Sequence, residues 1–213
     1  MATRQWSLLM NGIRTYTGGF TATNGYTFPA QDGLIAVDAP DGMAQWLEQT
    51  GQRLAALFLT HWHFDHVVDA ARIAREHACE VWAYGPSTPS DRLEKLLVLA
   101  GMDVSIENYP VHHPLQGLDT ARIAGAGFLL RHVPGHSPDS LVLIHEPSRI
   151  IFSGDTVMDG GIGRTDFPGG DFEELVTGIR QKILTLPGDF RILPGHGGIS
   201  TVSEELRGNP YLR

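Results

Sequence analysis

Potential metal ligands are concentrated in residues 60–66, which read Thr-His-Trp-His-Phe-Asp-His and follow a nearly pure apolar run at 54–59. Along an extended segment alternate side chains face the same way, so His61 and His63 can reach one ion together. Asp65 and His66 fall where the chain turns into a helix, which places them beside a second ion. The alternative is a polar loop that is rich in histidine by chance, and three histidines at this spacing argue against it.

Three later apolar runs each end in a glycine followed by one residue that can bind a metal, and these residues are His136, Asp155 and His196. Glycine lets the backbone turn sharply and pass close to a bound ion. A lone histidine is more often structural, but four strand ends that each supply ligands are not well explained in that way. The pattern predicts a metal centre where these four strand ends meet.

The elements that would position these residues are short strands and helices with one apolar face. Strands are predicted at 6–10, 13–17, 24–28, 34–38, 54–59, 81–84, 128–133, 141–145, 150–153 and 190–193. Helices are predicted at 67–77, 92–100, 172–186 and 202–207, and Asp41 is expected to cap a further short helix that ends at Gly51. Strands dominate each half, so two sheets packed on each other and flanked by helices are the expected arrangement.

The composition fits one domain that spans residues 1–213, and it excludes several classes of partner. The net charge of −8 and the scattered basic residues argue against a nucleic-acid partner, because phosphate binding needs clustered Lys and Arg. No segment approaches the ~20 apolar residues of a membrane span, and the N-terminus does not resemble a signal peptide. The single cysteine, Cys79, is expected to be buried at a strand entrance, and it fits a reducing cytoplasm.

The H-x-H-x-D-H motif, together with the later G-H, G-D and G-H elements, resembles the metallo-β-lactamase superfamily, and the resemblance covers essentially the whole chain. It implies an α/β fold, the αββα four-layer sandwich in which two mixed sheets are flanked by helices. It also implies two metal sites that share one residue. The first site would contain His61, His63 and His136, and the second Asp65, His66 and His196, with Asp155 bridging the two.

The resemblance also implies a reaction. Imidazole and carboxylate ligands suit zinc, iron or manganese. We expect two divalent metal ions per chain, with zinc as the favoured metal and iron or manganese as alternatives. Two ions about 3.5–4 Å apart can share a hydroxide that attacks a carbonyl, because each lowers the pKa of bound water toward ~7. Asp65 would be the catalytic residue that accepts a proton. Asp38 matches a family aspartate that lies behind the site and orients a ligand, although a plain turn residue is an equal alternative.

Two further segments resemble the glyoxalase II branch, and specifically its short, single-domain bacterial members. They are residues 161–171, which read Gly-Ile-Gly-Arg-Thr-Asp-Phe-Pro-Gly-Gly-Asp, and residues 209–212, Asn-Pro-Tyr-Leu. That branch hydrolyses thioesters such as S-lactoylglutathione, which makes a small-molecule thioester the expected substrate. Arg164 aligns with a basic position that binds the glutathione carboxylate, and an Arg164–Asp166 pair that stiffens the loop is the alternative. The helical C-terminal domain that holds glutathione in longer members is not expected here.

Three other functions compete with thioester hydrolysis. Persulfide dioxygenases share the fold and the Gly-Arg-Thr-Asp-Phe run but use one iron and oxygen. A lactonase would use the same hydroxide on a cyclic ester. A non-catalytic binding module is the third alternative, and the presence of a ligand at every motif position argues against it. No oligomeric state is indicated by the sequence.

Overall fold

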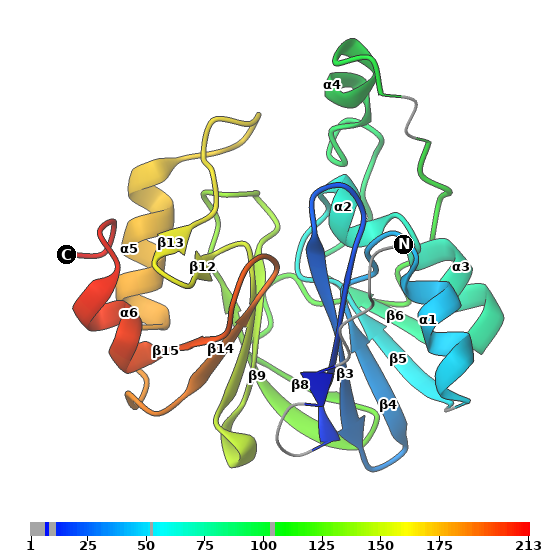
Figure 1. The fold of residues 1–213 in the computed structure, drawn as a ribbon, viewed down its shortest axis with the longest axis horizontal. Helices are drawn as coiled ribbons and strands as arrows, with labels where there is room; N and C mark the ends of the chain where they lie inside the picture. The colour runs from blue at the N-terminus through cyan, green and yellow to red at the C-terminus, as the bar shows by residue number, and fades with distance from the viewer. Residues whose placement is uncertain (1–6, 9–11, 52, 103–104) are drawn as a thin grey trace.

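The structure, a computed structural model, describes residues 7–8, 12–51, 53–102 and 105–213. Within these ranges two β-sheets pack face to face and helices cover their outer sides (Figure 1). The first sheet contains, in order, β1 (Ser7–Leu8), β2 (Arg14–Gly18), β3 (Thr23–Ala30), β4 (Gly33–Val37), β5 (Leu54–Phe58), β6 (Glu80–Ala83) and β7 (His113–Pro114). Its strands are antiparallel from β1 to β4 and parallel from β4 to β7, so the sheet is mixed.

The second sheet is also mixed, because β11 and β14 are parallel and its other pairs are antiparallel. Its order is β15 (Ser200–Thr201), β14 (Arg191–Pro194), β11 (Ile150–Gly154), β10 (Leu141–His145), β9 (Ala126–His132) and β8 (Thr120–Ile123). A small hairpin joins β12 (Val157–Met158) to β13 (Gly161–Ile162). The helices are α1 (Met43–Thr50), α2 (Phe64–Val67), α3 (Ala70–His77), α4 (Glu94–Leu99), α5 (Phe172–Lys182) and α6 (Val202–Gly208), and η2 (Glu146–Ser148) is a short 3₁₀ turn.

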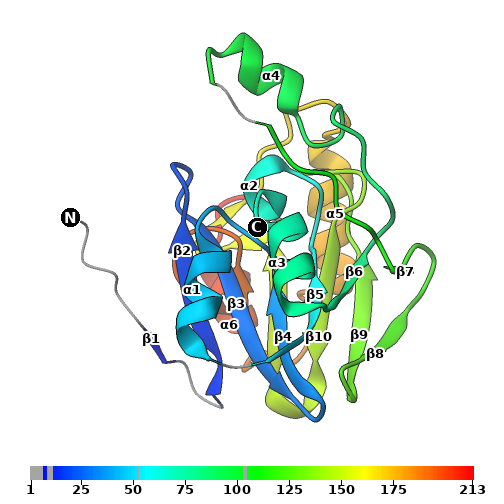
Figure 2. The same cartoon turned by 90° about the vertical axis from the view of Figure 1, so that its right-hand side faces the viewer.

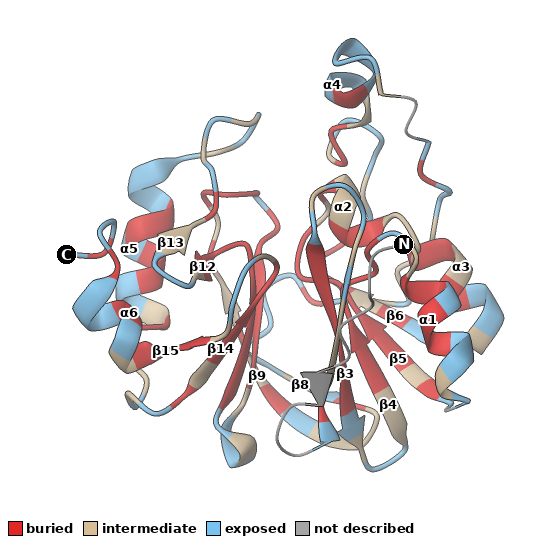
Figure 3. Ribbon diagram, viewed as in Figure 1, coloured by how far each residue is buried: buried red, intermediate tan, exposed pale blue. Residues whose placement is uncertain are grey.

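Alternation along the strands explains why four layers form. On β10, Leu141 and Leu143 point into the core between the sheets, whereas Val142 and Ile144 point toward α5 and α6. Successive side chains of a strand face opposite ways, so a strand that is apolar at every position must be covered on both faces. A third cluster fills the space between the first sheet and α1 and α3, and Figure 3 shows the buried residues gathered along these three interfaces. The predicted αββα sandwich is therefore confirmed.

Parallel pairing places the segments that follow β4, β5, β11 and β14 at one edge of the two sheets. Val37 at the end of β4 pairs with Phe58 at the end of β5, so the segments that follow the two strands emerge side by side. In the second sheet, Gly154 pairs with Pro194, which places the residue after β11 beside the one after β14. Parallel neighbours necessarily end at the same edge of a sheet. Two such pairs, one in each sheet, meet at the upper edge of the sandwich in Figure 1.

Two details of the predicted helices are wrong. Asp41 does not cap the first helix: the N-cap is Gly42, whose φ of 83° is a conformation that glycine adopts readily. The single helix predicted at 67–77 is instead α2 followed by α3. The helix is interrupted between α2 and α3 because the backbone of Ala39 takes up two of its hydrogen-bonding groups. The N–H of Ala39 donates to the carbonyl of His66, and the carbonyl of Ala39 accepts from the N–H of Asp69.

Other predicted elements hold with shifted ends. The helix predicted at 92–100 is α4, and the one predicted at 172–186 ends at Lys182. The strand predicted at 6–10 is described only at Ser7–Leu8, and its other residues lie outside the described ranges. Cys79 is buried directly before β6, as expected. None of the helices in the described part of the chain is long and apolar enough to cross a membrane.

Candidate metal centre

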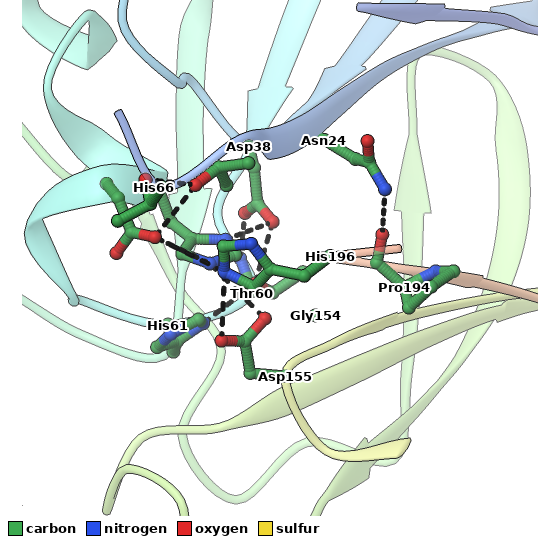
Figure 4. Close-up of polar contacts among 12 residues, drawn as sticks. Asn24, Asp38, Thr60, His61, His66, Gly154, Asp155, Pro194 and His196 are labelled. Carbon is green, nitrogen blue, oxygen red and sulfur yellow. Dashed lines mark hydrogen bonds and ion pairs between the residues drawn. The ribbon is translucent and has the colours of Figure 1, made fainter. Parts of the chain in front are cut away.

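Four strand ends carry all seven residues that the sequence predicts as ligands, and the structure brings them together at one edge of the sandwich. The strands concerned are β5, β9, β11 and β14. Figure 4 shows side chains from three of these strand ends, including Asp155, His66 and His196, turned toward one another. The seven residues, listed by strand end, are His61, His63, Asp65 and His66 after β5, His136 after β9, Asp155 after β11 and His196 after β14.

One group of three imidazoles forms the first half of the site. The ligand atoms of His61, His63 and His136 all lie within 4.8 Å of one another, and all three residues are buried. The Nε2 atoms of His61 and His136 face each other across 3.3 Å. Three imidazole nitrogens converging in a buried space form a donor set suited to a divalent transition metal.

A second group lies beside the first and contains Asp65, His66 and His196, whose ligand atoms also lie within 4.8 Å of one another. Oδ2 of Asp65 is 3.3 Å from Nε2 of His196 and 3.8 Å from Nε2 of His66. His66 is fully buried, whereas the side chain of His196 is 26% exposed. The second group is therefore the more open of the two.

Asp155 lies between the two groups. Its Oδ2 is 3.5 Å from Nε2 of His136 in the first group and 3.3 Å from Nε2 of His196 in the second. Its Oδ1 is 3.3 Å from Nε2 of His66. A single carboxylate thus faces both halves, which is the position that a bridging ligand requires.

Hydrogen bonds on the far side of three of the five rings, those of His61, His66 and His136, aim the Nε2 atom at the centre; Figure 4 shows the contact between His66 and Asp38. Nδ1 of His66 donates to Oδ2 of Asp38 at 2.8 Å, and Nδ1 of His136 donates to the carbonyl of Arg164 at 2.7 Å. The hydroxyl of Thr60 donates to Asp38, so its oxygen is free to accept from Nδ1 of His61 at 3.0 Å. In a neutral ring such contacts favour the tautomer that leaves Nε2 unprotonated, and they are common behind metal-binding histidines.

Asp38 lies behind the site, where the resemblance places it. It is 2% exposed, and its carboxylate accepts from the N–H and the hydroxyl of Thr60 as well as from His66. Its φ of 61° lies in the left-handed region, which is costly for a residue with a side chain. The surrounding hydrogen bonds outweigh that strain, because they satisfy both carboxylate oxygens in a buried place.

The protonation states of the first group suit a metal. Burial, reinforced by the neighbouring His66, lowers the pKa of His61 well below its usual value, and burial lowers the pKa of His63 to about 3. Burial likewise lowers the pKa of His136. All three rings are therefore neutral at physiological pH, which is the form that binds a metal.

The carboxylates carry the negative charge of the site. Burial acts to raise the pKa of Asp65, but the charge of His66 and hydrogen bonds from His196 and Thr23 outweigh it and lower the pKa to about 2. Burial also acts against ionisation of Asp155, and its histidine neighbours outweigh it and lower the pKa well below the usual range. The two carboxylates in turn outweigh the effect of burial on His66 and His196: they raise the pKa of His66 well above its usual value and that of His196 to about 10.

The surroundings of two buried atoms show whether the space between the two ligand groups suits cations. Nε2 of His66 and Oδ1 of Asp155 form no well-aligned hydrogen bond with a described residue, although the two atoms lie 3.3 Å apart. A buried polar atom without a partner costs roughly 1–3 kcal/mol, so such atoms are rare unless something else binds them. Both point into the space between the two groups, and the donors there are imidazole nitrogens and carboxylate oxygens. The residues present therefore fit two divalent cations.

Gly195 allows the β14 strand end to approach the others. A Cβ atom at this position would lie 2.2 Å from Oδ1 of Asp155 and 2.5 Å from Cε1 of His66. No larger residue fits without displacing one of these side chains. The glycine that precedes His196 in the sequence is thus required by close approach, as the strand-end pattern suggests.

Three polar residues of the site were not singled out from the sequence. The hydroxyl of Thr23 donates to Oδ2 of Asp65 at 2.8 Å. The side-chain amide of Asn24 donates to the carbonyls of Pro194 and Gly197, which fixes the loop on either side of His196 (Figure 4). Thr60 could have been found because it directly precedes the histidine motif. Thr23 and Asn24 lie on β3, far from the motif in sequence, and no local pattern marks them.

Arg164 lies at the edge of the site with its charge already engaged. Nε and Nη2 donate to the two carboxylate oxygens of Asp166, both at 2.7 Å, and the guanidinium lies 3.9 Å from the centre of the Phe167 ring. The loop-stiffening pair that the sequence suggested is therefore present. The backbone carbonyl of Arg164, and not its side chain, contacts the metal centre, because it accepts a hydrogen bond from Nδ1 of His136.

Similarity to known proteins agrees with this geometry. A protein of Haemophilus influenzae described as hydroxyacylglutathione hydrolase GloC is 35% identical over 185 residues, covering 83% of this chain and 86% of the relative. The crystal structure of BLEG-1 B3 metallo-beta-lactamase has a TM-score of 0.85 at 30% identity and covers 94% of this chain and 99% of its own. The crystal structure of TTHA1623 in a di-iron-bound form has a TM-score of 0.82 at 31% identity, covering 93% and 99%. The model of the Metallo-beta-lactamase superfamily matches residues 27–196.

Proposed function

Because the chain belongs to the metallo-beta-lactamase superfamily, we propose that it is a metal-dependent hydrolase that cleaves thioesters of the hydroxyacylglutathione type. The observation that carries the proposal is the donor set at the four strand ends, two groups of three ligands that face one carboxylate, Asp155. The name of the GloC relative supports a thioester as the substrate.

The two groups have separate roles in this proposal. His61, His63 and His136 would hold one divalent ion, Asp65, His66 and His196 the other, and Asp155 would contact both. When bound, the two ions supply an activated water near neutral pH and polarise the substrate carbonyl. We expect zinc, with iron or manganese as alternatives, and the di-iron form of the TTHA1623 structure supports iron as one of them.

The chain's own residues would orient the reactants and move a proton. Asp65 borders the cavity beside the metal centre and is ionised at pH 7, so its carboxylate would be the group that accepts a proton from the reacting water. The hydroxyl of Thr23 fixes the orientation of this carboxylate. Thr60 holds the ring of His61 in place, and Asp38 holds the ring of His66. None of these residues needs to form a covalent bond to the substrate.

Release of free thiol from S-lactoylglutathione by the zinc-, iron- or manganese-reconstituted protein tests the proposal. We expect thiol release that stops on chelation and returns when the metal is restored. A parallel measurement of persulfide-dependent oxygen uptake distinguishes the dioxygenase alternative. Oxygen uptake without thiol release from any thioester would contradict hydrolysis.

Arg164 is proposed to contact an anionic substrate only in competition with Asp166. Replacing Arg164 with alanine should raise KM for S-lactoylglutathione about twofold to fivefold with kcat little changed, because an exposed charge contact is worth roughly 0.2–1 kcal/mol. Asp166→Asn should lower KM, because it frees the guanidinium. Steady-state kinetics of both variants check this, and a KM that moves in the same direction in both would assign the pair to loop structure alone.

A further inference from the structure

A cavity of about 530 Å³ opens directly onto the metal centre and is lined mainly by apolar side chains. At its inner end lie five of the proposed ligands, among them His63 and Asp155. A molecule that reacts at the centre can therefore place its remaining atoms in this cavity. The chemistry of its walls indicates which substituents are favoured there.

The first wall comes from the hairpin between β2 and β3. Phe20 at its tip stacks on Phe64 of α2, with ring centres 5.6 Å apart and planes 16° from parallel. Phe20 is nevertheless 67% exposed. Two stacked aromatic rings, one of them largely exposed at the mouth of a reaction site, form a surface suited to apolar contact.

The second wall is the segment around α4, which projects beyond the upper edge of the sandwich, above α2 (Figures 1 and 2). It contributes Leu93, Leu97 and Met102 to the cavity. A buried guanidinium fixes this segment: Arg92 is 2% exposed and donates to Glu94 at 2.6 Å and to Asn108 at 3.1 Å. The apolar wall is therefore anchored at its base.

The third wall is the loop after Asp155, which contributes Met158, Ile162 and Phe167. Among the described residues that line the cavity Arg164 is the only Lys or Arg, and Asp166 already neutralises it. Glutathione carries two carboxylates and an ammonium group, and the part of the lining that the structure describes offers no unpaired lysine or arginine to the carboxylates. Charged groups placed here would lose hydration without gaining partners.

We propose, on the basis of the thioester hydrolase function above, that the cavity selects thioesters with an apolar chain on one side of the scissile C–S bond. The chain would lie between the Phe20–Phe64 pair and the α4 segment, and it would belong to the acyl group or to the thiol. S-Lactoylglutathione would be hydrolysed but would not be the preferred substrate. The α4 segment would thus determine specificity.

Two series of thioesters test the proposal with the metal-loaded protein. The first varies the acyl chain from acetyl to octanoyl on N-acetylcysteamine, and the second varies the thiol of an acetyl thioester from N-acetylcysteamine to benzyl mercaptan. Burial of each methylene can contribute up to about fourfold, so kcat/KM should rise at least about tenfold from acetyl to hexanoyl, or from the polar to the apolar thiol. The series that shows the rise identifies the side of the bond that occupies the cavity.

Two matched variants on α4 show whether the rise in kcat/KM depends on the residues that line the cavity. Leu97, which is 7% exposed and lines the cavity, and Leu99, which is 83% exposed and does not, are each replaced with asparagine. Leu97→Asn should remove most of the rise along the series, and Leu99→Asn should retain it. Thermal unfolding reports whether Leu97→Asn folds; should it not, Phe20→Ser at the exposed hairpin tip is expected to weaken the same rise.

The outcomes separate this proposal from the one on which it rests. Flat kcat/KM along both series, with faster hydrolysis of S-lactoylglutathione, would overturn apolar selection and leave the thioester hydrolase intact. Failure to hydrolyse any thioester in either series or S-lactoylglutathione would instead overturn the proposed function.

Discussion

Replacing Asp155 with alanine is expected to abolish hydrolysis and to lower the metal content of both halves of the site. Asp155 is the carboxylate that faces both groups, 3.5 Å from His136 and 3.3 Å from His196. Its removal should reduce kcat/KM by roughly a thousandfold or more, because loss of one preorganised electrostatic contact alone costs about 10²–10³. Steady-state kinetics and elemental analysis of the same preparation measure both effects.

Two comparison variants show whether the loss of activity and metal arises because Asp155 faces both ligand groups. Asp159→Ala removes an exposed carboxylate four residues further along the chain and should leave both measurements unchanged. His196→Ala should empty mainly the second group, because His196 contacts Asp65 and Asp155 but not the three-histidine group. If Asp155→Ala keeps kcat/KM within a few-fold of the unmodified protein, Asp155 does not join the two groups.

Gly195→Ala is expected to have the second largest effect, although it adds only one methyl group. The new Cβ atom would lie 2.2 Å from Oδ1 of Asp155 and 2.5 Å from Cε1 of His66, so both side chains must shift. A displacement of about 1 Å in a reacting constellation can cost about 10²-fold in rate. Overpacking of this kind also destabilises a core by roughly 1–3 kcal/mol, which calorimetric unfolding would detect.

Gly161→Ala is the matched control, because no atom of a described residue other than its chain neighbours lies within 4 Å of a Cβ built at that position. It should leave kcat/KM, the metal content and the unfolding temperature close to those of the unmodified protein. Equal behaviour of Gly195→Ala and Gly161→Ala would show that the β14 strand end is not confined as tightly as the contacts at Gly195 imply.

Much of the fold could be predicted because strand alternation and apolar runs are local properties of the sequence. The run at 54–59 is apolar at every position, and the structure accounts for this by burying Leu57 against the helices and Phe58 between the sheets. The errors arose where contacts distant in sequence decide the local structure. The backbone of Ala39, for example, divides the predicted helix at 67–77 by taking two of its hydrogen bonds.

The same distinction applies to the site. The ligand candidates could be identified because each follows a strand, and parallel neighbours end at one edge. Thr23 and Asn24 could not, because their role depends on the packing of β3 beside both α2 and the loop at His196. The pairing of Arg164 with Asp166 was one of two possibilities that sequence spacing left open, and only the conformation of the loop decides between them.

Elemental analysis of the purified chain, after reconstitution with excess zinc and removal of free metal, tests the central claim most directly. Two groups of three ligands that face Asp155 predict two zinc ions per chain. A stoichiometry that remains at one ion per chain, despite excess metal, would contradict the dinuclear site.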